Sequence, residues 1–124
     1  MAFSDTSDKL GIVYTPNEIV DFIIHSVNDV LRSEFGVGLG DRGIHVLDPF
    51  TGTGTFVVRL IQSGLITKEQ LVHKFTSEIH ANEIVLLAYY VAAINIEETF
   101  HAITAKYEQF NGIVLTDTFQ MTEG

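Results

Sequence analysis

The amino-acid sequence predicts an α/β fold, in which a short parallel sheet of about three strands is flanked by helices. Short, apolar, β-branched runs typical of buried strands alternate along the chain with longer segments of helical periodicity. Polar or glycine-rich residues follow these runs, where ligand-binding loops lie in open parallel sheets. The chain has 124 residues, 46% hydrophobic and 19% charged, which is enough for one core and too few for a second domain.

The first helix is predicted after an N-terminal arm. Residues 1–10 are polar and aperiodic, so we expect a flexible arm there and the domain itself over residues 11–124. The sequence Thr15-Pro16-Asn17-Glu18 has the pattern of a capping box, with threonine as the cap and proline at the first helical position. The helix is expected to end near Phe35, before Gly36. Its apolar residues recur at helical spacing and predict a face toward the core: Ile19, Val20, Phe22, Ile23, Val27, Val30 and Leu31. The polar residues predicted on the opposite face are Asp21, Asn28, Asp29 and Arg32.

Residues 44–47 form the first predicted strand, which we expect to be buried. A glycine-rich turn follows it, and a helix is predicted from about Thr55 to the stop signal Ser63-Gly64. The residues predicted to point inward from this helix are Phe56, Val57, Leu60 and Ile61. The sequence Thr67-Lys68-Glu69-Gln70 is a second capping-box pattern and predicts a short helix.

The second strand is predicted between residues 75 and 82. The strongly apolar segment from residue 83 to about residue 96 predicts a helix buried against the sheet, continued as helix or as a helical turn to about residue 107. Residues 112–115 form the third predicted strand, and residues 116–119 lie just past its end. This order of elements favours a parallel α/β half-sheet.

The composition excludes several kinds of site. The chain has no cysteine, which excludes disulfides, thiolate metal sites and a cysteine nucleophile, and which fits a reducing cytoplasm. Residues 1–8 do not resemble a signal peptide and no apolar stretch approaches about 18 residues, so we expect a soluble, cytoplasmic protein. The net charge of −9 argues against this chain binding a polyanion such as nucleic acid by itself. The five histidines show no pair at metal-ligand spacing with a carboxylate partner, so we predict no metal site.

Gly52 and Gly54 identify the turn after the first predicted strand as a candidate ligand site. Glycine permits positive φ and close approach of a ligand to the backbone, and the helix that follows points free N–H groups at the same place. A dinucleotide-binding motif would need a third glycine where Val57 stands, and a phosphate-binding loop would need a Gly-Lys-Ser/Thr sequence that is absent. The alternative is that these glycines only allow tight packing.

The block from Leu47 to Phe56, Leu-Asp-Pro-Phe-Thr-Gly-Thr-Gly-Thr-Phe, resembles the first S-adenosylmethionine-binding motif of amino-methylating DNA methyltransferases. Residues 11–16, Gly-Ile-Val-Tyr-Thr-Pro, resemble the aromatic-Thr-Pro motif that precedes the first helix in adenine-N6 enzymes. Residues 80–84, His-Ala-Asn-Glu-Ile, resemble the motif that ends the second strand, and residues 116–119, Thr-Asp-Thr-Phe, the acidic turn that ends the third. The pattern is most similar to the methyltransferase module of single-chain restriction-modification enzymes that also carry nuclease and helicase parts.

This resemblance implies a Rossmann-like methyltransferase fold that binds S-adenosylmethionine as its cofactor. Glu83 would accept hydrogen bonds from both ribose hydroxyls, and Asp117 from the adenine amine, with Phe119 or Ile84 packing on the ring. Asp48 and the glycine backbone would lie near the methionine part, over whose carboxylate residues 14–16 would close. The complete set of implied cofactor-binding residues is Tyr14, Thr15, Pro16, Asp48, Pro49, Phe50, Thr51, Gly52, Thr53, Gly54, Thr55, Phe56, Glu83, Ile84, Asp117, Thr118 and Phe119.

Simpler roles stand beside these. Glu83 is alternatively a carboxylate in the first turn of a helix, placed there for the helix dipole. Asp117 is alternatively a plain turn residue. Tyr14 and Thr15 alternatively cap and staple the first helix.

The catalytic motif of adenine-N6 methyltransferases, Asn/Asp-Pro-Pro-Tyr/Phe, is absent, because the only prolines are Pro16 and Pro49. We therefore predict no catalytic residue here. We expect the amino-terminal, cofactor-binding part of a restriction-modification adenine methyltransferase, inactive alone and contacting DNA through other regions. The alternatives are part of a methyltransferase for RNA, protein or a small molecule, and a non-catalytic module that packs against helicase or nuclease domains. An unpaired third strand predicts self-association or marginal stability, or packing against the rest of a parent chain.

Overall fold

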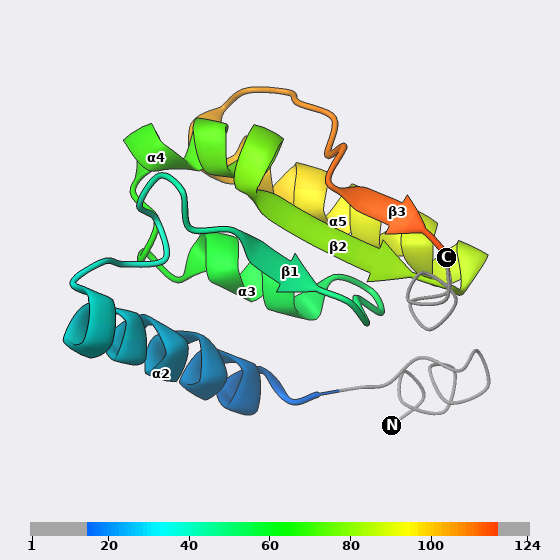
Figure 1. Cartoon of the computed structure of the whole chain (residues 1–124). Helices are drawn as coiled ribbons and strands as arrows, with labels where there is room; N and C mark the ends of the chain where they lie inside the picture. The colour runs from blue at the N-terminus through cyan, green and yellow to red at the C-terminus, as the bar shows by residue number, and fades with distance from the viewer. Residues whose placement is uncertain (1–14, 117–124) are drawn as a thin grey trace.

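The computed structural model describes residues 15–116, which form one three-stranded parallel sheet. Its strands are β1 (Val46–Asp48), β2 (Ile79–Glu83) and β3 (Ile113–Leu115), and β2 lies between the other two. Val46 pairs with Ile79, and Ala81 with Ile113. The three carboxyl ends therefore lie along one edge of the sheet, where the arrowheads of Figure 1 point. The predicted α/β class and parallel sheet are confirmed.

Four α-helices accompany the sheet within the described residues: α2 (Asn17–Phe35), α3 (Thr55–Gln62), α4 (Lys68–His73) and α5 (Leu86–Thr104). The two crossover helices, α3 and α5, contact each other, and α2 packs against α3 on the side away from α5 (Figure 1). The opposite face of the sheet is open, since Leu47 is 66% exposed. No helix within residues 15–116 is both long enough and apolar enough to cross a membrane.

The core lies between the sheet and the two crossover helices. Phe75 and Phe100 stack with ring centroids 4.0 Å apart, and Phe110 lies 5.0 Å from Phe75. The other buried side chains of this core come from one face of the sheet and from α3 and α5: Val57, Leu60, Ile61, Ile79, Ala81, Ala92, Ile96 and Ile113. Three of the four inward residues predicted for α3 are thus buried, while Phe56 is half-buried.

The two capping-box patterns have different outcomes. At α4 the box forms: the Gln70 N–H donates to Thr67 Oγ1 at 3.2 Å, and the Thr67 N–H donates to Gln70 Oε1 at 2.9 Å. At α2 the prediction is wrong, because Pro16 itself occupies the cap position and no side chain caps the helix. The Pro16 carbonyl accepts from the Ile19 and Val20 N–H groups, each at 3.1 Å, so Thr15 lies one residue too early to act as the cap.

The apolar face predicted for α2 is only partly buried. Val20 and Ile24 pack inward, but Phe22 is 72% exposed, and the other exposed apolar residues of this helix are Ile19, Ile23, Val27, Val30 and Phe35. Asn28, predicted on the polar face, is buried and its Oδ1 accepts from the Leu39 N–H at 2.9 Å. The physical reason is that α2 rests on α3 along a narrow stripe, and no described element covers the apolar stripe beside it.

The strand boundaries also differ from those predicted. The first strand begins at Val46 and is an edge strand, so the expected burial is wrong. The segment predicted to begin the second strand continues α4 as a π-helical turn, η1 (Lys74–Glu78), and β2 begins only at Ile79. Glu83 consequently ends a strand, and α5 begins at Leu86. The predicted continuation beyond residue 96 is confirmed, since α5 runs to Thr104.

A buried ion pair explains the π-helical turn. The Lys74 side chain is fully buried, and its Nζ donates to the carbonyls of Asp41 and Ile44, each at 2.7 Å. Nζ also lies 2.9 Å from Glu78 Oε1, and Glu78 Oε2 accepts from the Gly43 N–H at 2.6 Å. Burial raises the pKa of Glu78 most strongly, but Lys74 and the Gly43 N–H together outweigh burial and hold it below its ordinary value of 4.5. The cluster fastens the chain that enters β1 to the chain that enters β2.

Candidate functional site

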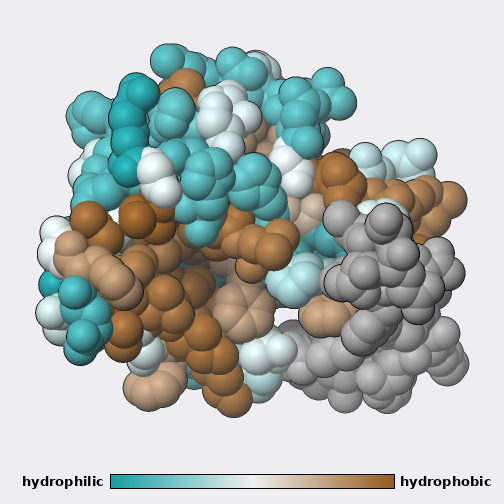
Figure 2. Space-filling model, viewed as in Figure 1, coloured by the Kyte–Doolittle hydropathy of each residue, from teal (hydrophilic) through white to brown (hydrophobic). Residues whose placement is uncertain are grey.

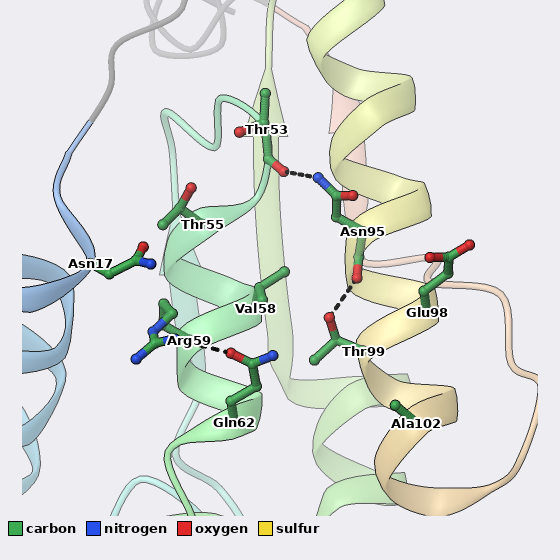
Figure 3. A pocket seen from close by; sticks show the side chains of 10 residues that line it. All are labelled: Asn17, Thr53, Thr55, Val58, Arg59, Gln62, Asn95, Glu98, Thr99 and Ala102. Atoms are coloured by element: carbon green, nitrogen blue, oxygen red, sulfur yellow. Dashed lines mark hydrogen bonds between the residues drawn. The ribbon is translucent and has the colours of Figure 1, made fainter. Parts of the chain in front are cut away.

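The carboxyl edge of the sheet gathers most of the residues that the sequence predicts for a ligand site. The turn after β1, the pair Glu83-Ile84 at the end of β2, and Thr116 after β3 lie along it. The start of α2 lies beside the same turn, because Asn17 lines one groove together with Thr53 and Thr55 (Figure 3). Thr15, half-buried, and Pro16, exposed, immediately precede Asn17. The predicted residues Tyr14, Asp117, Thr118 and Phe119 lie outside the described part of the chain.

The glycine turn has the backbone geometry that its sequence indicates. Gly52 has φ of 59° and Gly54 has φ of 93°, both in the left-handed region that favours glycine. Gly54 is the N-cap of α3, so the first N–H groups of this helix are free to face the carboxyl edge. A Cβ on Gly54 would lie 3.3 Å from Ala92 Cα, so this glycine also lets α3 approach α5 closely. The packing role and the ligand role are compatible at this position.

Glu83 fastens the glycine turn to the central strand. Its side chain is nearly buried, and Oε1 accepts from the Gly52 N–H at 2.8 Å. Oε2 accepts from the N–H groups of Ile84 at 3.1 Å and Val85 at 2.8 Å, just before α5 begins. The alternative of a carboxylate in the first turn of a helix is wrong, because Glu83 ends β2 and the first turn of α5 holds no acidic residue. A carboxylate offers about four lone-pair positions, so three accepted bonds leave capacity for one further donor.

Asp48 is the group at this edge whose hydrogen bonding is least complete. Its Oδ1 accepts from the Phe50 N–H at 3.3 Å, whereas its Oδ2 is buried and has no hydrogen-bond partner among the described residues. Burial raises the pKa of Asp48 above its ordinary value of 3.8; the Phe50 N–H opposes this shift, and the negative charge of Glu83 adds to it. A buried acceptor without a donor is costly, so Oδ2 is a natural place for a cationic or hydrogen-bond-donating ligand group.

Thr51 joins the turn to β2 through paired bonds with Asn82. The Thr51 N–H donates to the Asn82 carbonyl at 3.0 Å, and the Asn82 N–H donates to Thr51 Oγ1 at 3.0 Å. Thr51 Oγ1 in turn donates to the Asp48 carbonyl at 3.0 Å. Asn82 is not among the predicted site residues, although a polar amide beside Glu83 at the end of a predicted strand is a signal that could have found it.

Two apolar side chains project from the polar edge. Phe50 is 64% exposed and Ile84 is 61% exposed. They belong to the turn after β1 and to the end of β2, on either side of the bonds that Glu83 makes. Exposed apolar groups beside buried carboxylates suit a ligand with both a flat ring and polar groups.

The remaining predicted residues lie at the margins of the edge. Pro49 is half-buried, and the Thr53 carbonyl accepts from Asn95 Nδ2 at 3.0 Å (Figure 3). Thr55 begins α3. Phe56 and Asp48 both line an apolar hollow of about 430 Å³ between α2 and β1, and Glu83 does not line it.

A polar groove of about 680 Å³ runs between α3 and α5, beside the glycine turn (Figure 3). Thr53 and Thr55 are its only members from the predicted set. Its one cationic side chain, Arg59, is occupied: Nε and Nη2 donate to the carboxylate of Asp21 at 2.8 Å and 2.6 Å. Glu83 lines neither this groove nor the apolar hollow. We therefore do not assign the ligand site to this groove on its volume alone. The carboxylates of Asp48 and Glu83 lie at the ends of β1 and β2.

The tertiary structure brings two histidines together at the other end of the sheet. His45 Nδ1 and His80 Nε2 are 2.8 Å apart, and the rings stack at 5.1 Å. Glu78 lies 3.7 Å from His45 Nε2. The two facing nitrogens are occupied by each other, and among residues 15–116 no group of three His, Asp or Glu side chains is arranged to hold a metal ion.

A comparison with protein-family models gives a match over residues 1–123 to the model described as N-6 DNA Methylase. A comparison with curated protein sequences found no match.

Parts of three much longer chains in solved structures are similar to this chain. One is a nuclease-deletion mutant of the Type ISP restriction-modification enzyme LlaGI in complex with a DNA substrate mimic, with 54% sequence identity, a TM-score of 0.85, and coverage of 91% of this chain and 10% of that one. The ATP-dependent Type ISP restriction-modification enzyme LlaBIII bound to DNA has 54% identity and a TM-score of 0.86, over 99% of this chain and 9% of that one. The DrdV–DNA complex has 44% identity and a TM-score of 0.88, over 95% of this chain and 11% of that one. The chain thus spans about a tenth of the length of each.

Proposed function

Because this chain belongs to the N-6 DNA methylase family, we propose that the carboxyl edge of its sheet binds S-adenosylmethionine. The observation that carries the proposal is the buried Oδ2 of Asp48, which has no donor among the described residues and lies beside a glycine turn that Glu83 anchors. Within residues 15–116 the edge offers carboxylates and helix N–H groups and no free cation, which suits a positively charged sulfonium ligand better than a nucleotide phosphate.

Each part of the ligand has a counterpart among these residues. Asp48 Oδ2 would accept from the α-ammonium group of the methionine part, and the free N–H groups of α3 would face its carboxylate. Glu83, with one acceptor position left, would receive a ribose hydroxyl. Phe50 and Ile84 provide exposed apolar surface for the adenine ring.

The residues beyond the described chain take the roles that the resemblance implies. Asp117 would accept from the adenine amine and Phe119 would pack on the ring, with Thr118 between them. Tyr14 would close over the methionine carboxylate together with Thr15 and Pro16.

We infer that the chain serves as the cofactor-binding part of a DNA adenine-N6 methyltransferase in a restriction-modification enzyme. The family match and the similarity to DNA-bound restriction enzymes favour DNA over RNA, protein or a small molecule as the substrate. S-adenosylmethionine supplies the methyl group when bound. The residues of this chain hold the cofactor and contribute nothing to the adenine amine, since the sequence contains no Asn/Asp-Pro-Pro-Tyr/Phe segment. With a net charge of −9, the chain would depend on other regions to hold DNA.

Calorimetric titration with S-adenosylmethionine and with its demethylated product tests the cofactor site. We expect binding by the unaltered chain and loss of binding in Glu83→Ala, which frees the glycine turn from β2. Glu98→Ala removes an exposed glutamate from the groove between α3 and α5 and should bind normally. Equal affinity in all three chains would disprove the assignment of Glu83.

We also propose that the apolar stripe of α2 packs against another surface, either a second copy or the rest of a parent chain. Figure 2 shows hydrophobic surface gathered over α2 and toward β1, and both β1 and β3 are edge strands. Sedimentation of the chain should show concentration-dependent association that Phe22→Asp reduces, whereas Tyr107→Asp, an exposed aromatic beyond α5, should not. A compact monomer at all concentrations would count against self-association.

A further inference from the structure

Asn82 is a buried amide at the centre of the carboxyl edge. It is the second-last residue of β2, the strand between the other two, and it is 5% exposed. Successive side chains of a strand point to opposite faces, so Asn82 faces away from the carboxylate of Glu83. The proposed cofactor contacts do not involve its side chain.

The side chain of Asn82 reaches the chain that leaves each neighbouring strand. Its Nδ2 donates to the carbonyl of Thr116, after β3, at 2.8 Å and to the carbonyl of Pro49, after β1, at 3.4 Å. Its backbone exchanges two bonds of 3.0 Å with Thr51 in the glycine turn. One residue of the central strand thus contacts the chain that leaves each of the two neighbouring strands.

The Asn82 side-chain bonds matter because the strands on either side of β2 are short. β1 pairs with β2 at three positions, and β3 also pairs with β2 at three positions. Such short ladders leave the segments just beyond them weakly constrained relative to each other. A primary amide has two N–H donors that diverge in one plane, and this geometry suits carbonyls on its two sides. Aspartate has the same shape but no donor, and alanine has neither shape nor donor.

We propose that Asn82 is a positioning residue that fixes the spacing between the glycine turn and the chain leaving β3, and thereby the spacing between the methionine and adenine ends of the bound cofactor. This inference rests on the proposed function, in which Asp48 receives the methionine end and Ile84, just past the end of β2, packs on the adenine. A rigid spacing favours a ligand that spans both places, because the site then loses little conformational freedom on binding.

The test compares Asn82→Ala and Asn82→Asp with a matched control, Asn28→Ala. Asn28 is also buried and also loses a hydrogen bond on truncation, but its partner is the Leu39 N–H, which precedes the first strand. Affinity is measured for S-adenosylhomocysteine by calorimetry, and for adenosine and methionine separately by NMR titration.

Both Asn82 variants should lose about tenfold or more in affinity for S-adenosylhomocysteine, as expected for two lost hydrogen bonds. Their affinities for the separate adenosine and methionine should change by less than about threefold, since each half-site remains. Asn28→Ala should bind all three like the unaltered chain. The proposal is overturned if Asn82→Ala keeps its affinity for S-adenosylhomocysteine, if Asn82→Asp binds normally, or if the separate halves weaken as much as the whole.

Hydrogen exchange separates failure of this inference from failure of the proposed function. Absence of S-adenosylhomocysteine binding by the unaltered chain would disprove cofactor binding by this chain. The spacing role would then be decided without ligand: the Gly52 and Thr116 amides, which donate to Glu83 Oε1 and the Glu83 carbonyl, should both exchange faster in Asn82→Ala than in Asn28→Ala. Unchanged exchange at both amides would overturn the inference.

Discussion

A carboxylate lies at each end of the sheet, and the two differ in whether their oxygens have partners and in the direction of their pKa shifts. Before β2, Glu78 lies 2.9 Å from Lys74 Nζ and accepts a bond from the Gly43 N–H, and its pKa is held below its ordinary value. After β1, Asp48 has a buried oxygen without a partner among residues 15–116, and burial raises its pKa. At the first end the buried carboxylate is paired with a buried cation, and we expect the pair to contribute stability. At the second end, Asp48 Oδ2 lacks a hydrogen-bond donor, which lowers the stability of the folded chain. Such an arrangement is expected where a bound ligand supplies the donor.

The largest effect should come from breaking the ion pair at the first end. Lys74→Met leaves Glu78 buried without its cation and should lower the free energy of unfolding by about 3–5 kcal/mol. Chemical denaturation measures the loss, and Lys68→Met, at an exposed lysine of α4, should change stability by less than about 0.5 kcal/mol. Adding Glu78→Leu to Lys74→Met should recover part of the stability, because no unpaired charge is then buried. A loss no larger than that of the lysine control would show that the cluster is not a stabilising element.

Substitution of Asp48 should weaken cofactor binding and raise the free energy of unfolding. Asp48→Asn removes a half-buried charge whose Oδ2 has no partner among the described residues, and it should raise the free energy of unfolding near pH 7 by about 1 kcal/mol. The same substitution should weaken binding of S-adenosylmethionine, because the amide is a poor acceptor for an ammonium group. Denaturation and calorimetry on the same preparation measure both effects. A variant that is less stable and binds normally would contradict the comparison of the two ends.

Acid pH should act on the two ends with opposite sign. The lowered pKa of Glu78 means that its stabilisation is present above about pH 4.5 and is lost as the pH falls through the folded pKa. The raised pKa of Asp48 means that its ionisation destabilises the folded chain as the pH rises above its ordinary value of 3.8. Denaturation between about pH 3 and pH 6 should therefore show a shallower acid loss in Glu78→Gln and a steeper one in Asp48→Asn. Parallel curves for both variants and the unaltered chain would rule out this assignment.

The smallest effect concerns the helix starts at the two ends. Thr67→Ala removes the cap of α4 near the first end and should cost about 1 kcal/mol. Thr15→Ala, at the carboxyl edge, should cost little, because Thr15 caps no helix. Thermal unfolding of the two variants checks this pair, and equal losses would mean that Thr15 stabilises the chain in another way.

Local signals in the sequence predicted most elements correctly. The box at Thr67 formed, Gly36 has φ of 70° as the C-cap of α2, and Thr55 begins α3. These features depend on residues within about one helical turn of each other, so the sequence contains the whole interaction. The predicted start of α2 failed for an equally local reason, since Pro16 took the cap position that the pattern assigned to Thr15.

Features that depend on distant partners were not predictable in the same way. The π-helical turn follows from Lys74 reaching the carbonyls of Asp41 and Ile44, which lie more than one element earlier in the chain. The exposure of Phe22 depends on where α2 rests on α3. Periodicity identifies an apolar face but does not say which element covers it.

The sequence alone determined the parallel α/β order and the glycine turn after the first strand, because both are encoded by residue type and spacing along the chain. The prediction of Asp48 and Glu83 as site residues came from the resemblance of their motifs to those of adenine-N6 methyltransferases. Only the tertiary structure decided that Glu83 accepts from the Gly52 N–H, that Asp48 keeps a buried oxygen without a partner among residues 15–116, and that Asn82 bonds to the chain leaving β1 and the chain leaving β3. Hydrogen bonds between residues some thirty positions apart depend on the register of the sheet. Burial of a carboxylate likewise depends on everything packed around it, and neither is encoded within a local stretch of chain.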